Sequence, residues 1–458
     1  MIKVVARHFS TRNGSKKESM ALKFKRFNKI IAFEKQLEQE EASVGYVAYH
    51  SENMEVASIS KDIFGELSLP QTESFREELE AWNGRVSSQV FESQSHLTSQ
   101  NKIKSLNINV TQICNLHCIY CAAGGDGTYG DPIKSISIDK TLPQLKFFMD
   151  KLNEGERFHI SFLGGEPLLY AEGIDLICEY VLSISKIKNL QVTFKITTNG
   201  TLWNEVVESL LKKYKPTLAI SMDGSPEIND QLRPQKNGKS SSQAVLSTLR
   251  QLQFIRKEIG IVGVHSVFSS ENMSVTSAYN FFYEFNFDFM DFMYSVTDEN
   301  TEANRLYIQE MEKVADLAWQ RGGERELRKI YIFDHYFDLL DEQRRLENHC
   351  GIGKTLAVID SRNRIYNCPW TVGRPQDQIG DKTEIFSDRV KTYGETVIER
   401  NNCQTCWARY LCGGGCSFVH NTTDNKNNMK KSEFYCDRIK YIVGLSIYYF
   451  SKSRELMT

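Results

Sequence analysis

Apolar and polar positions along the middle of the chain follow two different patterns. Short apolar runs bounded by turn residues are typical of buried strands, and between them apolar residues recur at the spacing of a helix face. Strands that alternate with amphipathic helices favour a parallel sheet assembled from βα units. The expected strands are 105–112, 158–165, 190–198, 217–224, 259–269 and 287–296, and two of the expected helices are 141–154 and 202–215.

Six βα units predict an α/β fold, an open and partial (β/α)6 barrel. In barrels the residues that carry the chemistry gather at the carboxyl ends of the strands. Here those ends carry a cysteine-rich loop and the sequences GGEP, TTNG and SMDG. We therefore expect the functional site at this edge of the sheet.

The first hundred residues show a different pattern, in which short strands precede helices. A polar stretch at 94–103 predicts a linker after them. A separate domain is therefore predicted for residues 1–100. Its expected strands are 23–34, 44–51 and 54–60, and its expected helices are 61–68 and 72–93.

The last part of the chain begins with a helical pattern over 324–348. It continues as a cysteine-rich segment with turn residues and one closing helix. This pattern predicts a third domain over 326–458, which leaves 101–325 for the barrel.

The composition is that of an ordinary globular protein, with 41% hydrophobic and 25% charged residues among 458. Lys and Arg number 56 and Asp and Glu 58, so no net field favours a nucleic acid or an anionic membrane as partner. The start of the chain lacks the apolar core of a signal peptide, and the apolar run at 441–450 is too short to span a bilayer. A cytoplasmic protein is predicted.

Eleven cysteines are informative in a cytoplasmic chain, because clustered thiols there indicate metal sites or redox chemistry rather than disulfides. Cys178 stands alone in an apolar helical pattern and is expected in the core. The others form two groups, at 114–121 and at 350–436.

The first group has the spacing C-x3-C-x2-C, formed by Cys114, Cys118 and Cys121 directly after the first expected strand of the barrel. Three thiolates can hold three irons of a [4Fe–4S] cluster and leave the fourth iron open. A structural zinc site needs four ligands. His117 is adjacent to Cys118, which is a poor geometry for joint chelation.

This spacing, with the aromatic Tyr120 before the last cysteine, resembles that of radical S-adenosylmethionine (radical SAM) enzymes. The resemblance implies that the open iron binds the amino and carboxylate groups of SAM. One electron from the cluster then cleaves SAM to methionine and a 5′-deoxyadenosyl radical, which removes hydrogen from an unactivated C–H bond. The protein positions and shields this cofactor chemistry.

Further motifs stand where that family has its SAM contacts. GGEP follows the second expected strand and implies backbone contact with the methionine amino group, and TTNG follows the third. Ser221 and Arg233 have the twelve-residue spacing that implies contacts with the SAM ribose and carboxylate, for which a planar guanidinium is suited. The expected SAM-binding residues are Tyr120, Gly164, Gly165, Glu166, Asn199, Ser221 and Arg233.

The second cysteine group resembles the SPASM domain, which carries auxiliary iron–sulfur clusters. Its seven cysteines are spaced C-x17-C and then C-x2-C-x5-C-x3-C-x19-C. The resemblance implies auxiliary cluster I on Cys350, Cys368 and Cys416, and auxiliary cluster II on Cys403, Cys406, Cys412 and Cys436.

Cluster I has no fourth cysteine, so one of its irons is open or takes another ligand. Asn363 stands where the SPASM family usually has glycine, and asparagine tolerates the left-handed conformation better than most residues. Zinc ribbons fit the two short spacings individually, but seven cysteines divide awkwardly into tetrahedral sites.

Residues 1–100 resemble, by pattern, the peptide-recognition element of enzymes that modify ribosomal peptides. The resemblance implies a winged-helix-like fold that binds a leader peptide as an added strand. The edge near 54–60 and the helix at 72–92 are expected to form the groove. The alternative is a segment that serves only for packing.

The whole chain thus resembles a radical SAM–SPASM peptide maturase. The resemblance implies hydrogen abstraction from a ribosomally made precursor peptide, formation of intramolecular thioether cross-links, and SAM and three [4Fe–4S] clusters as cofactors. A flavodoxin or ferredoxin would supply electrons. The glycine-rich AAGGDGTYG after the first triad (122–130) is also similar to thioether-forming enzymes.

Other reactions stay open on the same architecture, namely carbon–carbon cross-linking, oxidation of serine or cysteine to formylglycine, and decarboxylation. A non-enzymatic iron–sulfur electron-transfer protein could use the same cysteines. Such a protein would not need the GGEP sequence or the pair Ser221 and Arg233.

Overall fold

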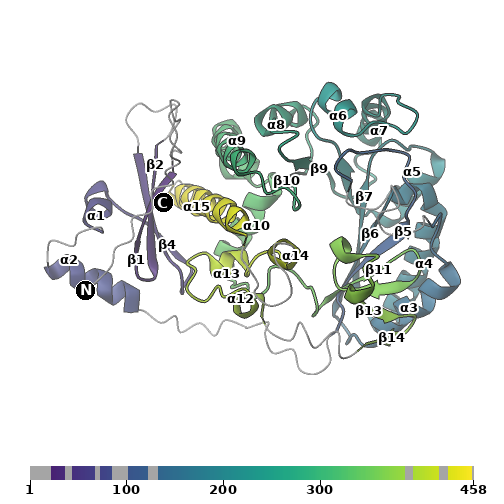
Figure 1. Cartoon of the computed structure of the whole chain (residues 1–458), viewed down its shortest axis with the longest axis horizontal. Coiled ribbons are helices and arrows are strands. Elements are labelled where there is room, and N and C mark those ends of the chain that lie inside the picture. The colour runs from purple at the N-terminus through teal and green to yellow at the C-terminus, as the bar shows by residue number, and fades with distance from the viewer. Residues whose placement is uncertain are drawn as a thin grey trace.

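The computed structural model describes residues 22–36, 44–67, 73–84, 102–121, 133–386, 396–421 and 432–455. Its largest sheet has ten strands in the order β10-β9-β8-β7-β6-β5-β11-β12-β13-β14. The strands from β5 to β10 are parallel and form the open partial barrel (Figure 1). All six predicted strands are confirmed, with small differences at their ends: β5 (Ser105–Thr111), β6 (Arg157–Gly164), β7 (Gln191–Thr198), β8 (Thr217–Ser221), β9 (Val262–Phe268) and β10 (Phe289–Tyr294).

Alternate residues of these strands face opposite sides of the sheet. On β5, Leu106, Ile108 and Val110 are fully buried in the main hydrophobic core. Asn107 and Asn109 point the other way, into the barrel. On this strand the polar side chains therefore face the barrel interior, and the apolar ones face the helices.

Helices connect the parallel strands, and Figure 1 shows α3, α4 and α5 on the outer face of β5, β6 and β7. The two predicted helices are confirmed with shifted ends, as α3 and α5. Helix α5 begins after Asn204, whose side-chain oxygen accepts a hydrogen bond from Val207 N at 2.9 Å. The helices are α3 (Ile138–Asp150), α4 (Ala171–Lys188), α5 (Glu205–Tyr214), α6 (Pro226–Leu232), α7 (Ser242–Phe254), α8 (Val275–Tyr283) and α9 (Thr301–Leu327).

The single helix predicted over 324–348 is wrong. Helix α9 ends at Leu327, and α10 (Tyr331–Asp341) follows after a break. In the break, Lys329 O accepts a hydrogen bond from Met290 N on the edge strand β10 at 2.6 Å. The backbone leaves the helical path here because it pairs with that edge.

The cysteine-rich part of the chain continues the barrel sheet. β11 (Leu356–Ile359) lies parallel to β5, and antiparallel strands extend the sheet further. The turn between β11 and the next strand contains Asn363 with φ of +62°, so the expected left-handed residue is confirmed. Its side-chain amide donates hydrogen bonds to Thr141 Oγ1 at 2.8 Å and Gln144 Oε1 at 3.0 Å. The added strands are β12 (Arg364–Tyr366), β13 (Gln378–Asp381) and β14 (Glu384–Ile385).

The N-terminal part forms a separate antiparallel sheet in the order β1-β2-β3-β4. The strand predicted at 23–34 is two strands, because Asn28 takes a left-handed φ of +51° and turns the chain into a hairpin. The likeness to a winged helix stays a prediction, and the second half of the helix predicted at 72–93 lies outside the described residues, as does most of the linker. The elements are β1 (Leu22–Phe27), β2 (Ile30–Gln36), β3 (Val44–His50), β4 (Glu55–Ser58), α1 (Lys61–Glu66) and α2 (Glu73–Gly84).

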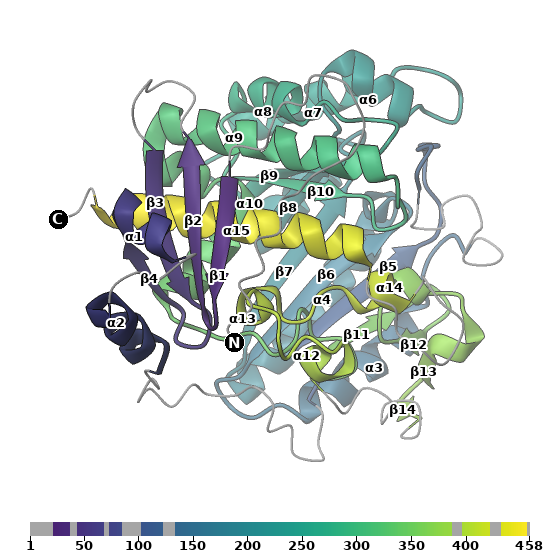
Figure 2. The same ribbon diagram turned by 60° about the vertical axis from the view of Figure 1, so that its left-hand side comes forward.

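The last helix, α15 (Glu433–Glu455), joins this sheet to the barrel. Figure 2 shows α15 behind β1, β2 and β3 and alongside α9. The approach is close at two glycines. A Cβ on Gly444 would lie 2.9 Å from a methyl carbon of Leu22, and one on Gly45 would lie 2.7 Å from the ring of Tyr448.

Buried charges tie the three parts together at this place. Lys35 on β2 is fully buried, and its Nζ lies 2.9 Å from Glu312 Oε1 and 3.1 Å from Asp316 Oδ1 on α9. Tyr441 and Tyr449 on α15 donate hydrogen bonds to the same two carboxylates. A single ammonium group therefore lies between two buried acids.

Replacing Lys35 by alanine should lower stability strongly, because it removes the buried ammonium group that pairs with both carboxylates. The loss of one partner of a buried ion pair costs about 3–5 kcal/mol. The matched control is Lys23→Ala on β1, whose exposed pair with Glu34 at 3.8 Å is worth at most about 1 kcal/mol. Thermal unfolding would contradict this account if both variants shifted the midpoint equally.

Among the described residues, no helix has the length and apolar character required to cross a membrane.

Candidate active site at the carboxyl ends of the barrel strands

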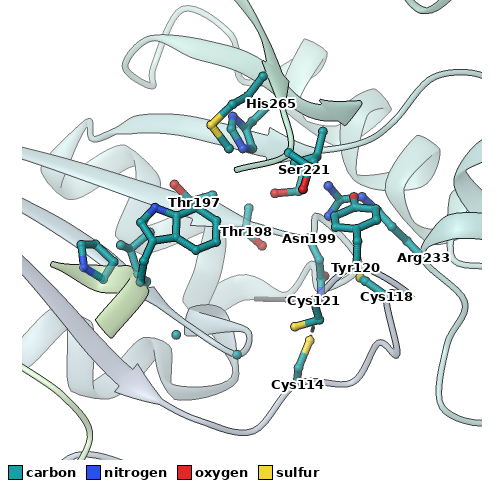
Figure 3. A pocket seen from close by; sticks show the side chains of 18 of the residues that line it. Cys114, Cys118, Tyr120, Cys121, Thr197, Thr198, Asn199, Ser221, Arg233 and His265 are labelled. Atoms are coloured by element: carbon teal, nitrogen blue, oxygen red, sulfur yellow. Dashed lines mark hydrogen bonds between the residues drawn. The ribbon is translucent and has the colours of Figure 1, made fainter. Parts of the chain in front are cut away.

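A cavity of about 280 Å³ lies where the parallel strands end, as predicted for the site. Its wall includes residues from all six strands or the loops that follow them (Figure 3). The cysteine-rich part contributes Pro369 and Trp370, which lie beside the barrel mouth. Asn109, Gly164, Thr198, Ser221, Val267 and Met293 line the cavity from the six strands.

The first cysteine loop forms one side of this cavity, lined by Cys114, Cys118 and Cys121. Backbone hydrogen bonds hold it at both ends. On one side, Gly165 N and Glu166 N donate to the carbonyls of Thr111 and Ile113, both at 2.9 Å. On the other side, His117 N donates to Pro234 O at 2.8 Å and Ile119 N to Leu232 O at 3.0 Å. The loop is thus fixed between the end of β6 and the segment after α6.

The two glycines of GGEP are required by the passage of this loop. A Cβ on Gly164 would lie 2.1 Å from Thr111 O, and one on Gly165 would lie 2.3 Å from Ile113 O. Gly164 also has φ of +131°, which side chains rarely allow. Both glycines line the cavity. They were expected to let the backbone approach SAM, whereas in the structure they let the cysteine loop pass close to the end of β6.

Glu166 lies behind the cavity wall, unlike the other residues predicted to bind SAM. Its buried carboxylate accepts hydrogen bonds from Asn199 N at 2.6 Å, Thr198 Oγ1 at 2.7 Å and Leu168 N at 3.0 Å. Burial raises its pKa to about 7. Asn199 in turn donates to Asn115 Oδ1 at 2.8 Å and lies 3.7 Å from Cys114 Sγ. Glu166 therefore positions Asn199 against the cysteine loop.

Arg233 is held at the cavity wall by Asp223, a residue that the sequence analysis missed. Its Nε and Nη2 donate to Asp223 Oδ2 at 2.8 Å and Oδ1 at 3.1 Å, and Tyr120 OH bonds to the same carboxylate. Both members of the pair are buried. The sequence could have indicated Asp223, because this residue lies in the SMDG motif, two residues after Ser221. The Arg233 guanidinium, which was expected to bind the SAM carboxylate, thus already uses two of its donors on Asp223.

Seven of the eight other cysteines lie in the two sets implied by the SPASM resemblance. Burial, with Cys416 and Cys350 beside it, raises the pKa of Cys368 to about 12. Burial raises the pKa of Cys412 well above its ordinary value, and Cys406, Cys436 and Cys403 raise it further. Cys178 is buried in α4, so its predicted place in the core is confirmed.

This chemistry fits iron binding. Such thiols are hard to ionise in the bare protein, whereas a bound metal cation removes their protons. Within the described residues, no three ligand side chains converge as they would on a single metal ion. A [4Fe–4S] cluster instead takes one thiolate at each iron.

The set of Cys350, Cys368 and Cys416 lies next to the cavity. Cys368 directly precedes Pro369 and Trp370, which line it, and packs with Phe418 in a small apolar cluster. The Trp370 ring stacks on Phe418 with a centroid distance of 5.7 Å. The glycine-rich segment 122–130 lies outside the described residues.

Comparison with known proteins agrees with this geometry. Residues 108–273, which include the first cysteine loop, match the family model of the Radical SAM superfamily. The protein is an enzyme with a radical SAM domain. Its chemistry therefore needs SAM and a [4Fe–4S] cluster, for which Cys114, Cys118 and Cys121 are the proposed ligands.

Relatives of this enzyme include the cysteine-type anaerobic sulfatase-maturating enzyme of Clostridium novyi (strain NT). It is 27% identical over 71% of the present chain and 90% of its own length. The solved structure "Native anSMEcpe with bound AdoMet and Cp18Cys peptide" has a TM-score of 0.62 at 19% identity, covering 77% of this chain and 99% of that one. "Native anSMEcpe with bound AdoMet" has a TM-score of 0.61 at 18% identity, covering 76% and 97%. These structures show that the fold is shared.

Proposed function

We propose that this radical SAM enzyme is a peptide maturase that forms thioether cross-links in a ribosomally made precursor peptide. The observation that carries the proposal is the place of Cys350, Cys368 and Cys416 beside the cavity. Three cysteines leave one iron of an auxiliary cluster without a thiolate from the protein. SAM and its own cluster supply the radical that removes hydrogen from the substrate.

The geometry suits attack by a substrate sulfur. An iron with a free position lowers the pKa of a thiol that binds it, which favours the thiolate. Pro369 and Trp370 connect the cysteine set to the cavity wall, so that a substrate thiol there is near the SAM site. Cys403, Cys406, Cys412 and Cys436 would hold a second auxiliary cluster, with flavodoxin or ferredoxin as donor.

Leader recognition is proposed for the N-terminal domain. A second cavity of about 470 Å³ lies between β4 and α2, lined among others by Ala57, Leu79 and Trp82. Among the described strands, β4 lies at the edge of its sheet. An extended leader peptide can add to such an edge through main-chain hydrogen bonds. The position of this cavity supports the groove expected between the edge near 54–60 and the helix at 72–92.

The thioether reaction is tested with a short cysteine-containing peptide encoded next to the enzyme. We expect a product lighter by two hydrogens for each bridge and resistant to thiol alkylation. Replacing the acceptor cysteine of the peptide by alanine should abolish that bridge. Mass spectrometry would contradict the proposal if the cysteine-free peptide still lost two hydrogens between two carbon atoms.

A second candidate, oxidation of a peptide cysteine or serine to formylglycine, is favoured by the names of the relatives. Its product contains an aldehyde, so it reacts with hydrazide reagents, whereas a thioether does not. The same incubation therefore distinguishes the two reactions.

A further inference from the structure

A histidine–aspartate pair joins two neighbouring strands inside the barrel. His265 on β9 and Asp291 on β10 lie directly opposite in the strand register, with His265 Nδ1 2.8 Å from Asp291 Oδ2. His265 also lines the cavity, and Figure 3 shows its ring at the end farthest from Cys114. No other hydrogen bond to the ring is found in the described part of the chain. One ring nitrogen is thus fixed by a carboxylate, and the other is free for a ligand.

Among the described residues that line the cavity, His265 carries the side chain that most often serves as a general base. No carboxylate lines the cavity in this part of the chain. The Tyr120 hydroxyl donates a hydrogen bond to the Asp223 carboxylate, and Arg233 is permanently cationic. The three lining cysteines are proposed iron ligands.

Asp291 is equipped to support a base. Burial raises the pKa of Asp291, but the adjacent His265 and, more weakly, Lys195 on β7 lower it by more. The net effect is a lowered pKa, so the carboxyl is ionised at neutral pH. A carboxylate at Nδ1 selects the tautomer that carries its hydrogen there and leaves the lone pair on Nε2. It also stabilises the imidazolium that forms when Nε2 takes a proton.

We propose that His265 is the catalytic base that receives the substrate proton during cross-linking, with Asp291 as its positioning residue. The role rests on the proposed function. A substrate C–H bond breaks homolytically and its hydrogen atom leaves with the 5′-deoxyadenosyl group. The S–H bond of the acceptor cysteine breaks heterolytically, and its proton goes to His265 Nε2. A C–S bond forms, and the remaining electron passes to a one-electron acceptor of the iron–sulfur class.

The test separates hydrogen abstraction from product formation. The reconstituted holoenzyme is given the neighbouring precursor peptide, deuterated at carbon, and deuterium in 5′-deoxyadenosine is compared with cross-linked product. In His265→Gln, we expect deuterium transfer to continue while product per transfer falls about 100-fold, the lower end for general base catalysis. Asp291→Asn should reduce the same ratio by a smaller factor.

The matched control is His159→Gln on β6. His159 bonds to Thr193 and Ser161 inside the barrel and does not line the cavity, so its ratio should equal that of the wild type. Added imidazole should restore product in His265→Ala. Iron content and the dissociation constants of SAM and peptide, measured without turnover, should be unchanged in His265→Gln.

A wild-type ratio in His265→Gln would overturn the assignment. A weaker SAM affinity that accounts for the whole loss would also overturn it and place His265 in cofactor binding. If the wild-type enzyme cleaves SAM but leaves the peptide unaltered, the proposed function fails, and this role fails with it.

Discussion

Replacing Cys114, Cys118 and Cys121 together by alanine should abolish SAM cleavage and remove about four of about twelve irons. Ten of the eleven cysteines fall into sets of three, three and four, which corresponds to three [4Fe–4S] clusters. The first set lines the cavity together with Ser221 and Arg233, so its cluster is the one placed to meet SAM. Iron analysis of anaerobically purified protein and assay of 5′-deoxyadenosine measure both effects.

The chain offers a matched control in Cys178→Ala. This cysteine is buried in α4, away from the three sets, so its loss should leave the iron content and SAM cleavage unchanged. Unchanged iron in the triple variant, or zinc in its place, would contradict the assignment of the first loop.

The second large effect is expected in the N-terminal groove. Ala57→Arg places a long charged side chain in the cavity between β4 and α2, where the leader is proposed to bind. We expect the affinity for the full precursor to fall at least tenfold, which is about 1.4 kcal/mol. Modification of a leaderless core peptide at high concentration should be unaffected. Peptide binding and product formation are the measurements.

Ala81→Arg is the control for this experiment. Ala81 is an exposed alanine on α2 that does not line the groove, so the same substitution adds the same charge outside the proposed site. Equal binding by the two variants would indicate that the domain serves only for packing. Deleting the domain is a poorer test, because deletion uncovers the apolar face of α15 and leaves Glu312 and Asp316 without Lys35.

The local sequence pattern was sufficient to predict the barrel strands, because each strand is a short apolar run whose two faces differ. It failed where long-range pairing overrides the pattern. The helical run after 324 is broken because the segment around Lys329 pairs with the edge strand β10. β11 could not be assigned to the barrel sheet, since its partner β5 is far away in the chain.

In the candidate site too, residues in local motifs were predicted, and residues that depend on long-range contacts were missed. Cysteine spacing and the short motifs are read along the chain, and they led to nine residues that line the cavity. Asp223 was missed although it lies in a motif, because its function appears only when it meets Arg233 and Tyr120. His265 and Asp291 were missed because only the register of two strands brings them together.

The packing of the N-terminal sheet on α15 sets an order of events during synthesis. Leu22 N donates a hydrogen bond to Tyr441 OH, 419 positions later in the chain. At 5–20 residues per second, the ribosome needs roughly 20–80 s to make that partner. During this interval the apolar face formed by Ile31, Phe33 and Tyr49 has no native cover, and cellular chaperones would have to shield it. A nascent chain that stalls before residue 433 would therefore be an aggregation hazard even with a finished barrel.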